Sequence, residues 1–393
     1  MTVHDRAMNA LHRLVSPATA DPLLWSARAA VGLAIVAVIV AAASLSFDQT
    51  ATPDEARQPK PQEKHVAPTS AAGSEASTGG GIAAATYQHW DVPGDRRLLM
   101  IPAVGADGRV WAGDMEGETL TLHAASGARP LALPVPAGTG AHTMGVAIDS
   151  ANTVWLAQDG VHAIGRYDPE TRRYTAYPTP SYNASPFGIA TDAEGRVWFT
   201  ELAARRIGVF NPDTETFTEY PLPDGAGNPY WLALAPDGRV WFTTLTAPTV
   251  GVLDPPSGTI QMIPILGLSE QDGTTGIDLA ADGAVWFGTR EGVLGRVDPS
   301  SLAVATYRTP GEKVYGVALD RNGRVWAAST RNAVFAFDPD SAQFCSIQTG
   351  DGAWWLTDAP DGSIWVSESI SGASGLGWIS PDRAADPCAG GAG

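Results

Sequence analysis

Short runs of alternating apolar and polar residues, separated by turn residues, follow one another from about Thr86 onward. The stretch from Ser185 to Pro223 shows the pattern in full, as SPFGIATD, EGRVWFTE, RIGVFNPDT and TFTEYPLP. Alternation with a period of two, interrupted by Glu-Gly, Asn-Pro-Asp and proline-rich turns, predicts antiparallel strands joined by tight turns. One such stretch therefore predicts one four-stranded sheet.

The same stretch recurs about every 40 residues, and in each copy a β-branched residue leads into a tryptophan on the second predicted strand. These tryptophans are Trp111, Trp155, Trp198, Trp241, Trp286, Trp326 and Trp365, with steps of 44, 43, 43, 45, 40 and 39 residues. A sustained period near 40 indicates a repeat architecture in which no unit buries its apolar face alone. Seven units of four strands predict an all-β fold, a seven-bladed β-propeller, over residues 86–380.

The two ends of the predicted propeller complete each other. The seventh repeat supplies GAWWLTDAP, GSIWVSE and SGLGWISP and then a glycine-rich tail, residues 381–393, so it lacks an outer strand. Residues 86–92 have the pattern of the outer strand at 216–223. We therefore expect the terminal strands to pair and close the ring, which leaves no open sheet edge.

The part of the chain before the repeats has a different character. Residues 29–47 carry no charge over 19 positions, enough at ~1.5 Å per residue to cross a ~30 Å hydrocarbon layer. They predict one transmembrane helix after an N-terminal segment, residues 1–28. A cleaved signal peptide is the alternative, because Ala41 to Ala43 offer small residues to a peptidase. Residues 48–85, rich in Pro, Ala, Ser, Thr and Gly, predict a flexible linker.

The distribution of charged residues predicts a cellular location and excludes nucleic acid as a partner. Arg28 precedes the predicted helix and Asp48 follows it, which favours a cytoplasmic N-terminus and a single-pass protein of the cell membrane. The propeller would then lie on the periplasmic or extracytoplasmic side. Residues 86–393 hold 19 of the 25 basic and 35 of the 42 acidic side chains, a formal charge of −16. Such a surface repels phosphate backbones, so we expect no nucleic acid partner. We also expect a monomeric propeller that binds a small-molecule or peptide ligand at the channel mouth.

The two cysteines and the repeated tryptophans have structural interpretations. Cys345 and Cys388 lack metal-site spacing and are too few for a disulfide scaffold, and their spacing leaves their pairing open. The tryptophans are expected to fill the space between neighbouring sheets. Asp-Gly or Asn-Gly ahead of several of them predicts two-residue hairpin turns.

Propeller geometry predicts where a site would lie. The first strand of each blade lines the central channel and the second runs back beside it, so the start of one and the end of the other share a face. Large aromatic residues at the starts of several first strands favour an extended, partly aromatic ligand. The predicted ligand-binding residues are Phe187, Tyr230, Trp231, Tyr315, Trp354 and Trp355. The alternative is that these rings plug the channel.

Polar residues of the same face supply candidate chemistry. Asp114 and Glu368, each three residues after a tryptophan in adjacent blades, are candidate ligands of one divalent cation such as Mg²⁺. Solvated surface charges are the alternative. His142 is the only histidine at a first-strand entry and is the candidate catalytic base, with His162 as a second possibility. The alternative for both histidines is polar surface.

The repeat phrases resemble those of a known family. Residues 186–189 (PFGI), 195–201 (GRVWFTE), 206–208 (RIG) and 218–223 (TEYPLP) are similar to the repeats of the virginiamycin B lyase family, the streptogramin lyases. The resemblance covers about residues 86–380. It implies a seven-bladed propeller and a magnesium-assisted elimination that opens the ester linkage of a cyclic depsipeptide antibiotic without water.

The chain departs from this family at the catalytic positions. The last blade of the family begins with Glu-Pro-His-Gly, in which the Glu holds the metal and the His is the base, whereas residues 352–355 here read GAWW. A second metal-binding Glu of the family is present as Glu368. The substrate-contacting His of the preceding blade is replaced in the stretch Val314-Tyr315-Gly316. Loss of a base and a metal carboxylate should remove most of an elimination rate.

Three functions therefore stay open, and the sequence does not decide whether the chain is an enzyme. The first is a membrane-anchored, extracytoplasmic, streptogramin-lyase-like propeller that binds an apolar or aromatic ligand, with a metal-assisted C–O lyase reaction implied only by the resemblance. The second is a non-catalytic binding or scaffold propeller of the cell envelope. The third is a metal-dependent lactonase or hydrolase, for which only Asn228 among the strand entries offers an amide ligand.

Overall fold

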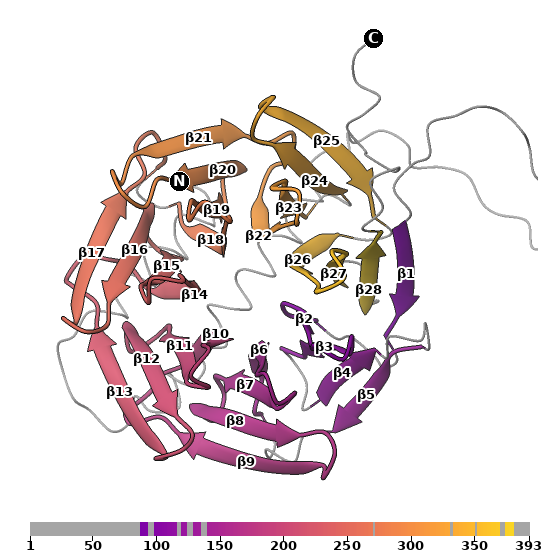
Figure 1. The fold of residues 1–393 in the computed structure, drawn as a ribbon, viewed down its shortest axis with the longest axis vertical. Helices are drawn as coiled ribbons and strands as arrows, with labels where there is room; N and C mark the ends of the chain where they lie inside the picture. Colours follow the sequence, from indigo (N-terminus) through magenta and orange to yellow (C-terminus); the bar gives the residue numbers. More distant parts are fainter. Residues whose placement is uncertain are drawn as a thin grey trace, which may run out of the picture. The chain divides into compact units, whose positions relative to one another are not determined.

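The structure, a computed structural model, describes residues 87–92, 98–115, 119–123, 129–134, 140–269, 272–330, 333–349, 352–369 and 374–380. All of them belong to the part of the chain from Ala83 to Gly393. They form seven four-stranded sheets arranged around a central axis, with the strands of each sheet following one another from the axis outward (Figure 1). The predicted seven-bladed propeller is confirmed.

The strands have the following bounds, blade by blade. Blades 1 to 3 are β2 Ala103–Val104, β3 Val110–Gly113, β4 Thr119–His123 and β5 Leu131–Pro134; β6 Thr143–Ile148, β7 Val154–Gln158, β8 Ala163–Asp168 and β9 Arg173–Pro178; β10 Pro186–Thr191, β11 Val197–Glu201, β12 Arg206–Asn211 and β13 Thr216–Pro221. Blades 4 to 6 are β14 Pro229–Leu234, β15 Val240–Thr244, β16 Thr249–Asp254 and β17 Thr259–Pro264; β18 Thr274–Leu279, β19 Val285–Thr289, β20 Val293–Val297 and β21 Val304–Arg308; β22 Val314–Leu319, β23 Val325–Ser329, β24 Ala333–Asp338 and β25 Gln343–Gln348. Blade 7 is β26 Ala353–Asp358, β27 Ile364–Ser369 and β28 Ser374–Ile379, with β1 Tyr87–Asp91 as its outer strand.

The ring closes by pairing of its two ends, as predicted. Strand β1 runs antiparallel to β28, with Tyr87 opposite Ile379 and Asp91 opposite Gly375. In Figure 1 the indigo β1 lies directly outside the yellow β28. The N-terminal strand thus occupies the sheet edge that the seventh repeat would otherwise leave unpaired.

The remaining predicted segments, residues 1–28, 29–47, 48–85 and 381–393, lie outside the described residues. Within the described ranges, no helix has the length and hydrophobicity needed to span a membrane. Cys345 on β25 is disulfide-bonded. The only other cysteine of the sequence, Cys388, lies outside the described residues.

A recurring aspartate explains the turn before each of several tryptophans. In blade 3 the Asp192 carboxylate accepts the backbone N–H groups of Glu194 (3.1 Å) and Arg196 (2.8 Å) and the indole N–H of Trp198 (2.8 Å). The Asp192 N–H donates to the Arg196 carbonyl (3.0 Å), and the loop between these two residues contains three residues. The last of the three is Gly195, which has φ +77°. The two-residue turn predicted at Asp-Gly and Asn-Gly is wrong, because in blade 6 the Asp320 N–H likewise donates to the Arg324 carbonyl (3.0 Å) across three residues that end at Gly323 with φ +80°. A three-residue loop with glycine in the left-handed region forms instead.

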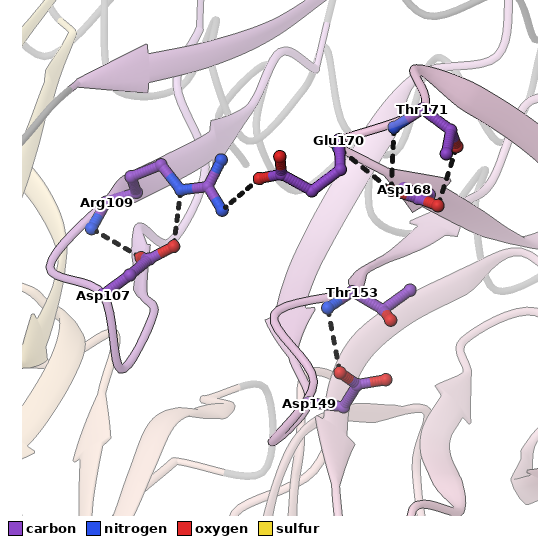
Figure 2. A network of polar contacts seen from close by, with 7 residues as sticks. All are labelled: Asp107, Arg109, Asp149, Thr153, Asp168, Glu170 and Thr171. Carbon is purple, nitrogen blue, oxygen red and sulfur yellow. Dashed lines mark hydrogen bonds and ion pairs between the residues drawn. The ribbon is translucent and has the colours of Figure 1, made fainter.

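Figure 2 shows the corresponding turn of blade 2, at Asp149, and a different aspartate, Asp107, within the turn of blade 1. Asp149 accepts the backbone N–H of Thr153 (2.9 Å), and Asp107 accepts both the backbone N–H (2.9 Å) and the Nε–H (2.6 Å) of Arg109. Arg109 also lies 3.5 Å from the Glu170 carboxylate in a turn of the neighbouring blade. These turns fix the start of each second strand and link adjacent blades.

The tryptophans pack between blades, as expected. All seven are at most 7% exposed. Trp155 of blade 2 packs against Val197 and Phe199 of blade 3. The equivalent tryptophans of blades 1, 3, 5, 6 and 7 each pack in the same way against the next blade, and in blade 7 the next blade is blade 1. The sequence repeat thus corresponds to one hydrophobic contact between each blade and the next.

Candidate functional site

The predicted aromatic residues lie together across the central channel. Phe187 stacks on Tyr230 with ring centroids 4.5 Å apart, and Tyr315 stacks on Trp354 at 4.8 Å. Trp355 lies 5.7 Å from Tyr230. Because blade 4 and blade 7 face each other across a seven-membered ring, the last contact spans the channel.

Trp231 completes the group, 5.7 Å from Trp355 and 6.2 Å from Phe187. We refer to these six residues, Phe187, Tyr230, Trp231, Tyr315, Trp354 and Trp355, as the aromatic plug. Each is at most 9% exposed. The channel is therefore filled by rings at this level. Their role as ligand contacts stays a prediction. A ligand would contact the plug at the face where the first strands begin and would not enter it.

Local backbone geometry directs these side chains inward. At the start of β10 the pairing with β11 shifts register between Pro186 and Ile189, and the first strands of blades 2 and 4 to 7 have similar shifts. Such a bulge re-aims the side chain at that point. Gly188 follows directly, and a Cβ there would lie 2.8 Å from the Tyr230 carbonyl oxygen. The glycine lets adjacent first strands approach closely enough for their rings to stack.

Two cationic side chains accompany the phenols of the plug. Burial raises the pKa of Tyr315 to about 12 and that of Tyr230 well above its usual value, while the nearby positive charge of Arg290 opposes both shifts. Burial, and then the charge of Arg290, lowers the pKa of Lys313. Arg290 directly follows β19 and Lys313 directly precedes β22, so both lie at the face where first strands begin.

Sequence reasoning did not assign Arg290 or Lys313 to the site. Lys313 offered one signal, since it is the only lysine after residue 85 and stands at a first-strand entry. Asp272, also missed, lies beside them: it is 3% exposed, and burial raises its pKa. The Arg290 N–H donates to the Gly273 carbonyl (3.2 Å), which holds this part of the two segments together. The entry face therefore combines aromatic edges with two cationic side chains and the neighbouring carboxyl groups of Asp272, Glu291 and Glu312.

His142 has a carboxylate partner. Its Nδ1 lies 3.5 Å from Oδ1 of Asp159, and the two side chains are only 16% and 10% exposed. His142 has φ +46°, a left-handed conformation that is unusual for a histidine and is often retained at functional positions. An imidazole oriented by a carboxylate is a common arrangement for a general base.

The second candidate, His162, lies on the other side of the same aspartate. Its backbone N–H donates to the Asp159 carbonyl (3.4 Å), and its Nδ1 accepts the backbone N–H of Ser185 (3.3 Å). Burial lowers the pKa of His162, and the charge of Asp159 acts against that shift. The structure thus brings the two histidines to one aspartate, with His162 held as an acceptor through Nδ1.

Glu368, the predicted metal ligand, contacts the closing strand. Its Oε2 lies 2.6 Å from Nδ1 of His89, and its Oε1 accepts the Tyr87 hydroxyl. The other ring nitrogen of His89 lies 3.1 Å from Asp91. A neutral imidazole has only one N–H, so two carboxylate partners require the protonated form. The hydrogen bond to Glu368 is the main cause that raises the pKa of His89 to about 9.

The described residues do not supply the donor set that the resemblance implies for magnesium. Glu368 is fully buried and already neutralised by His89, and the family's other glutamate is absent. Asp114 is 2% exposed. In the parts of the chain that the structure describes, no three or more His, Cys, Asp or Glu side chains gather as metal ligands. We therefore derive no reaction step through a metal, and the assignment of Mg²⁺ to Asp114 and Glu368 stays a prediction.

One further acidic pair lies in blade 3. Glu201, three residues after Trp198, is completely buried. Burial is the main cause that raises its pKa to about 8, and the charge of Glu219 adds to it. Glu219 accepts hydrogen bonds from the Ser181 backbone N–H (3.0 Å) and hydroxyl (2.6 Å). Glu201 is therefore largely protonated at neutral pH, as a buried carboxyl without a strong cationic partner should be.

Comparison with known proteins agrees with this fold. The virginiamycin B lyase family model matches residues 86–371. A streptogramin B lyase structure is similar with a TM-score of 0.68 and 22% identity, over 75% of this chain and 98% of that chain. A catalytically inactive virginiamycin B lyase from Staphylococcus aureus with quinupristin has a TM-score of 0.66 and 20% identity, over 74% and 98%. The extracellular domain of a one-component system from B. thetaiotaomicron has a TM-score of 0.60 and 16% identity, over 74% and 39%. No curated protein sequence matches the chain.

Proposed function

The chain belongs to the virginiamycin B lyase family, and we propose that it works as a binding propeller that holds an apolar or aromatic ligand at the face where the first strands begin. The observation that carries this proposal is the aromatic plug, with Arg290 near its phenols and Lys313 near Arg290. Flat rings favour stacking and apolar contact, and the two cations favour an anionic or carbonyl-rich group on the same ligand. The single-pass location outside the cytoplasm belongs to the same proposal, through the predicted helix at 29–47.

Binding is favoured over catalysis because the acid–base set of the family is incomplete. The stretch that would carry a glutamate and a histidine contributes Trp354 and Trp355 to the plug instead. The remaining family glutamate, Glu368, pairs with His89. An elimination needs a base near the reacting proton and stabilisation of the developing negative charge. Neither is supplied by these residues.

The test uses the full-length chain with quinupristin, the ligand of the similar inactive lyase. Binding is measured by isothermal titration calorimetry with and without Mg²⁺, and ring opening by liquid chromatography with mass detection. Elimination opens the ring without a change of mass, whereas hydrolysis adds one water, so the two reactions are distinguishable. We expect binding without ring opening.

A matched pair of variants locates the binding site. Lys313→Met removes a positive charge beside the plug and should weaken binding about fivefold or more. Arg173→Met removes one from the exposed outer strand β9 and should leave binding unchanged. No measurable binding, or equal affinity in both variants, would overturn the proposal.

His142 supports a second candidate function, a lyase or hydrolase. The specific observation is its 3.5 Å contact with Asp159, which can orient the imidazole as a base. If ring opening of quinupristin does occur, His142→Ala should abolish it and leave binding within about twofold. Ring opening that survives in His142→Ala would exclude this histidine as the base.

A further inference from the structure

A separate cavity lies at the other end of the channel. It has a volume of about 520 Å³ and is lined by residues from the first strands of all seven blades. Its lining comes from the second halves of these strands, such as Ile148, Leu234 and Leu279, so it opens on the face opposite the strand entries. Trp231 contributes both to its lining and to the aromatic plug. The plug therefore separates this cavity from the site proposed above.

The walls of the cavity combine apolar side chains with polar backbone and side-chain atoms, and the polar atoms supply the larger part of the exposed wall. Isoleucine, leucine and valine side chains from the first strands line it, among them Ile148, Ile189, Leu234, Leu279 and Val317. The aliphatic side chains offer contacts to the hydrocarbon part of a small organic molecule, and the polar atoms of the wall can accept hydrogen bonds from a charged group on it. A few polar groups then determine which molecule is held.

The distinctive polar group is the Asp278 carboxylate, near the end of β18. Its Oδ1 accepts the backbone N–H of Leu279 and its Oδ2 that of Leu319, both at 2.7 Å. These two bonds fix the carboxylate in place at the wall of the cavity. Asp358, at the end of β26, also lines the cavity and is exposed at its opening. Both side chains are acidic, so two carboxyl groups line the cavity.

Among the described residues, no cationic side chain contributes to the pKa of Asp278. Burial is the main cause that raises its pKa to about 7, and the charge of Asp358 raises it further. The charge of Arg321 acts on Asp358 and favours its ionised form. Arg321 donates to the Pro360 carbonyl at the edge of the cavity. A bound cation would favour the ionised form of Asp278 in place of its proton.

We propose that this cavity binds an organic cation, a protonated amine joined to an apolar body, with its ammonium group at Asp278 and its body against the first strands. A metal ion is a poorer fit, because the cavity offers two carboxylates and the Thr357 hydroxyl, which donates to the Asp358 carbonyl (3.3 Å). Hard cations such as Ca²⁺ take six to eight oxygen ligands. Among the described residues no group of three or more His, Cys, Asp or Glu surrounds such a point.

The experiment titrates the full-length chain with 2-phenylethylammonium at pH 8, where Asp278 is mostly ionised, and follows binding by calorimetry. The uncharged 2-phenylethanol tests the apolar walls alone, methylammonium tests charge alone, and MgCl₂ tests the metal alternative. We expect 2-phenylethylammonium to bind at least tenfold more tightly than each of the other three. Affinity should fall as pH is lowered from 8 to 6, because the proton then competes for Asp278.

Two variants and one control assign the site. Asp278→Asn should weaken amine binding at least tenfold and remove its dependence on pH. Ile148→Trp keeps the carboxylate but fills cavity space, and should also abolish binding. Asp213→Asn removes an exposed carboxylate in a turn of blade 3 and should change nothing. Thermal unfolding verifies that each variant is folded.

Several results would overturn the proposal. These are equal affinity for 2-phenylethanol, preferential binding of Mg²⁺, no amine binding at millimolar concentration, or unchanged binding in Ile148→Trp. The last variant decides the matter even if Asp278→Asn does not fold. Quinupristin binding at the opposite face, and its loss in Lys313→Met, test the other proposal separately.

Discussion

Replacing His89 by glutamine should remove a pH-dependent contribution to the stability of the closed ring. His89 on β1 lies between Glu368 on β27 (2.6 Å) and Asp91 (3.1 Å), and its pKa is raised from 6.5 to about 9, mainly by the hydrogen bond to Glu368. A raised pKa in the folded state means that the folded protein holds this proton more tightly than the unfolded chain. The contribution is therefore complete below pH 6.5 and disappears as the pH rises through about 9.

The size of the effect follows from the pKa and the exposure. A difference between 6.5 and about 9 corresponds to about 3.4 kcal/mol in a fully shielded pair, since one pKa unit is worth ~1.36 kcal/mol. About a third of the His89 side chain is exposed (32%), so solvent screening reduces this to about 1–2 kcal/mol. Glu368 is completely buried, which keeps the value above that of an ordinary surface pair.

The assay is urea unfolding, followed by tryptophan fluorescence, at pH 6 and pH 9.5. The free energy of unfolding of the parent chain should exceed that of His89→Gln by about 1–2 kcal/mol at pH 6, and the difference should shrink toward zero at pH 9.5. A double-mutant cycle with Glu368→Gln should show coupling at pH 6 only. Asp91→Asn is the control, because the Asp91 side chain is 86% exposed and should matter much less. Parallel pH profiles for the parent and His89→Gln would refute the assignment of a protonated His89 to the closing strand.

Three further predictions follow from the fold. A chain that begins at residue 95 lacks β1 and should lose cooperative unfolding in calorimetry, whereas one that begins at residue 83 should melt like the full chain; equal melting would contradict closure by β1. Gly195→Ala should lower the free energy of unfolding in urea by about 1 kcal/mol, because Gly195 has φ +77° with open space around it. Gly208→Ala should lower it more, because its Cβ would lie 2.3 Å from Cζ of Phe199. The reverse order would contradict this account. Glu201→Gln should stabilise the protein by about 1–3 kcal/mol at pH 9 and hardly at all at pH 4. The reason is that the raised pKa of Glu201 (about 8) makes the folded state lose stability as the pH rises from 4.5 through 8. Equal effects at both pH values would exclude a protonated Glu201.

The fold was predictable because one packing requirement recurs in every blade. A buried tryptophan such as Trp155 must reach Val197 of the next blade, so the period of the sequence repeats the geometry of the ring. The closing strand was predictable for a related reason, since the seventh repeat lacks one strand and residues 86–92 have its pattern. The three-residue turn at Asn322-Gly323 was missed because it depends on a bond from the Trp326 indole to Asp320, six residues earlier, which a dipeptide signal does not contain.

The candidate site was predictable only in part. Counting positions within a repeat placed Tyr230 and Trp355 at the same face, but their contact depends on side chains from opposite blades meeting after the ring has closed. The partner of Glu368 is 279 positions away in sequence, at His89, so no local pattern connects them. Asp278 looks like any other acidic residue of a strand until burial and the two backbone N–H donors distinguish it.

The aromatic plug separates the charged side chains at the two ends of the channel. Arg290 and Lys313 lie at the end where the first strands begin, and Asp278 and Asp358 lie at the other. Opposite charges in one continuous water-filled channel would attract each other's ligands and counterions, whereas rings that touch across the axis separate the two spaces. The sites should therefore act independently. Lys313→Met should leave amine binding unchanged and Asp278→Asn should leave quinupristin binding unchanged, whereas a Trp355→Ala variant, which opens the plug, should make each site respond to the ligand of the other.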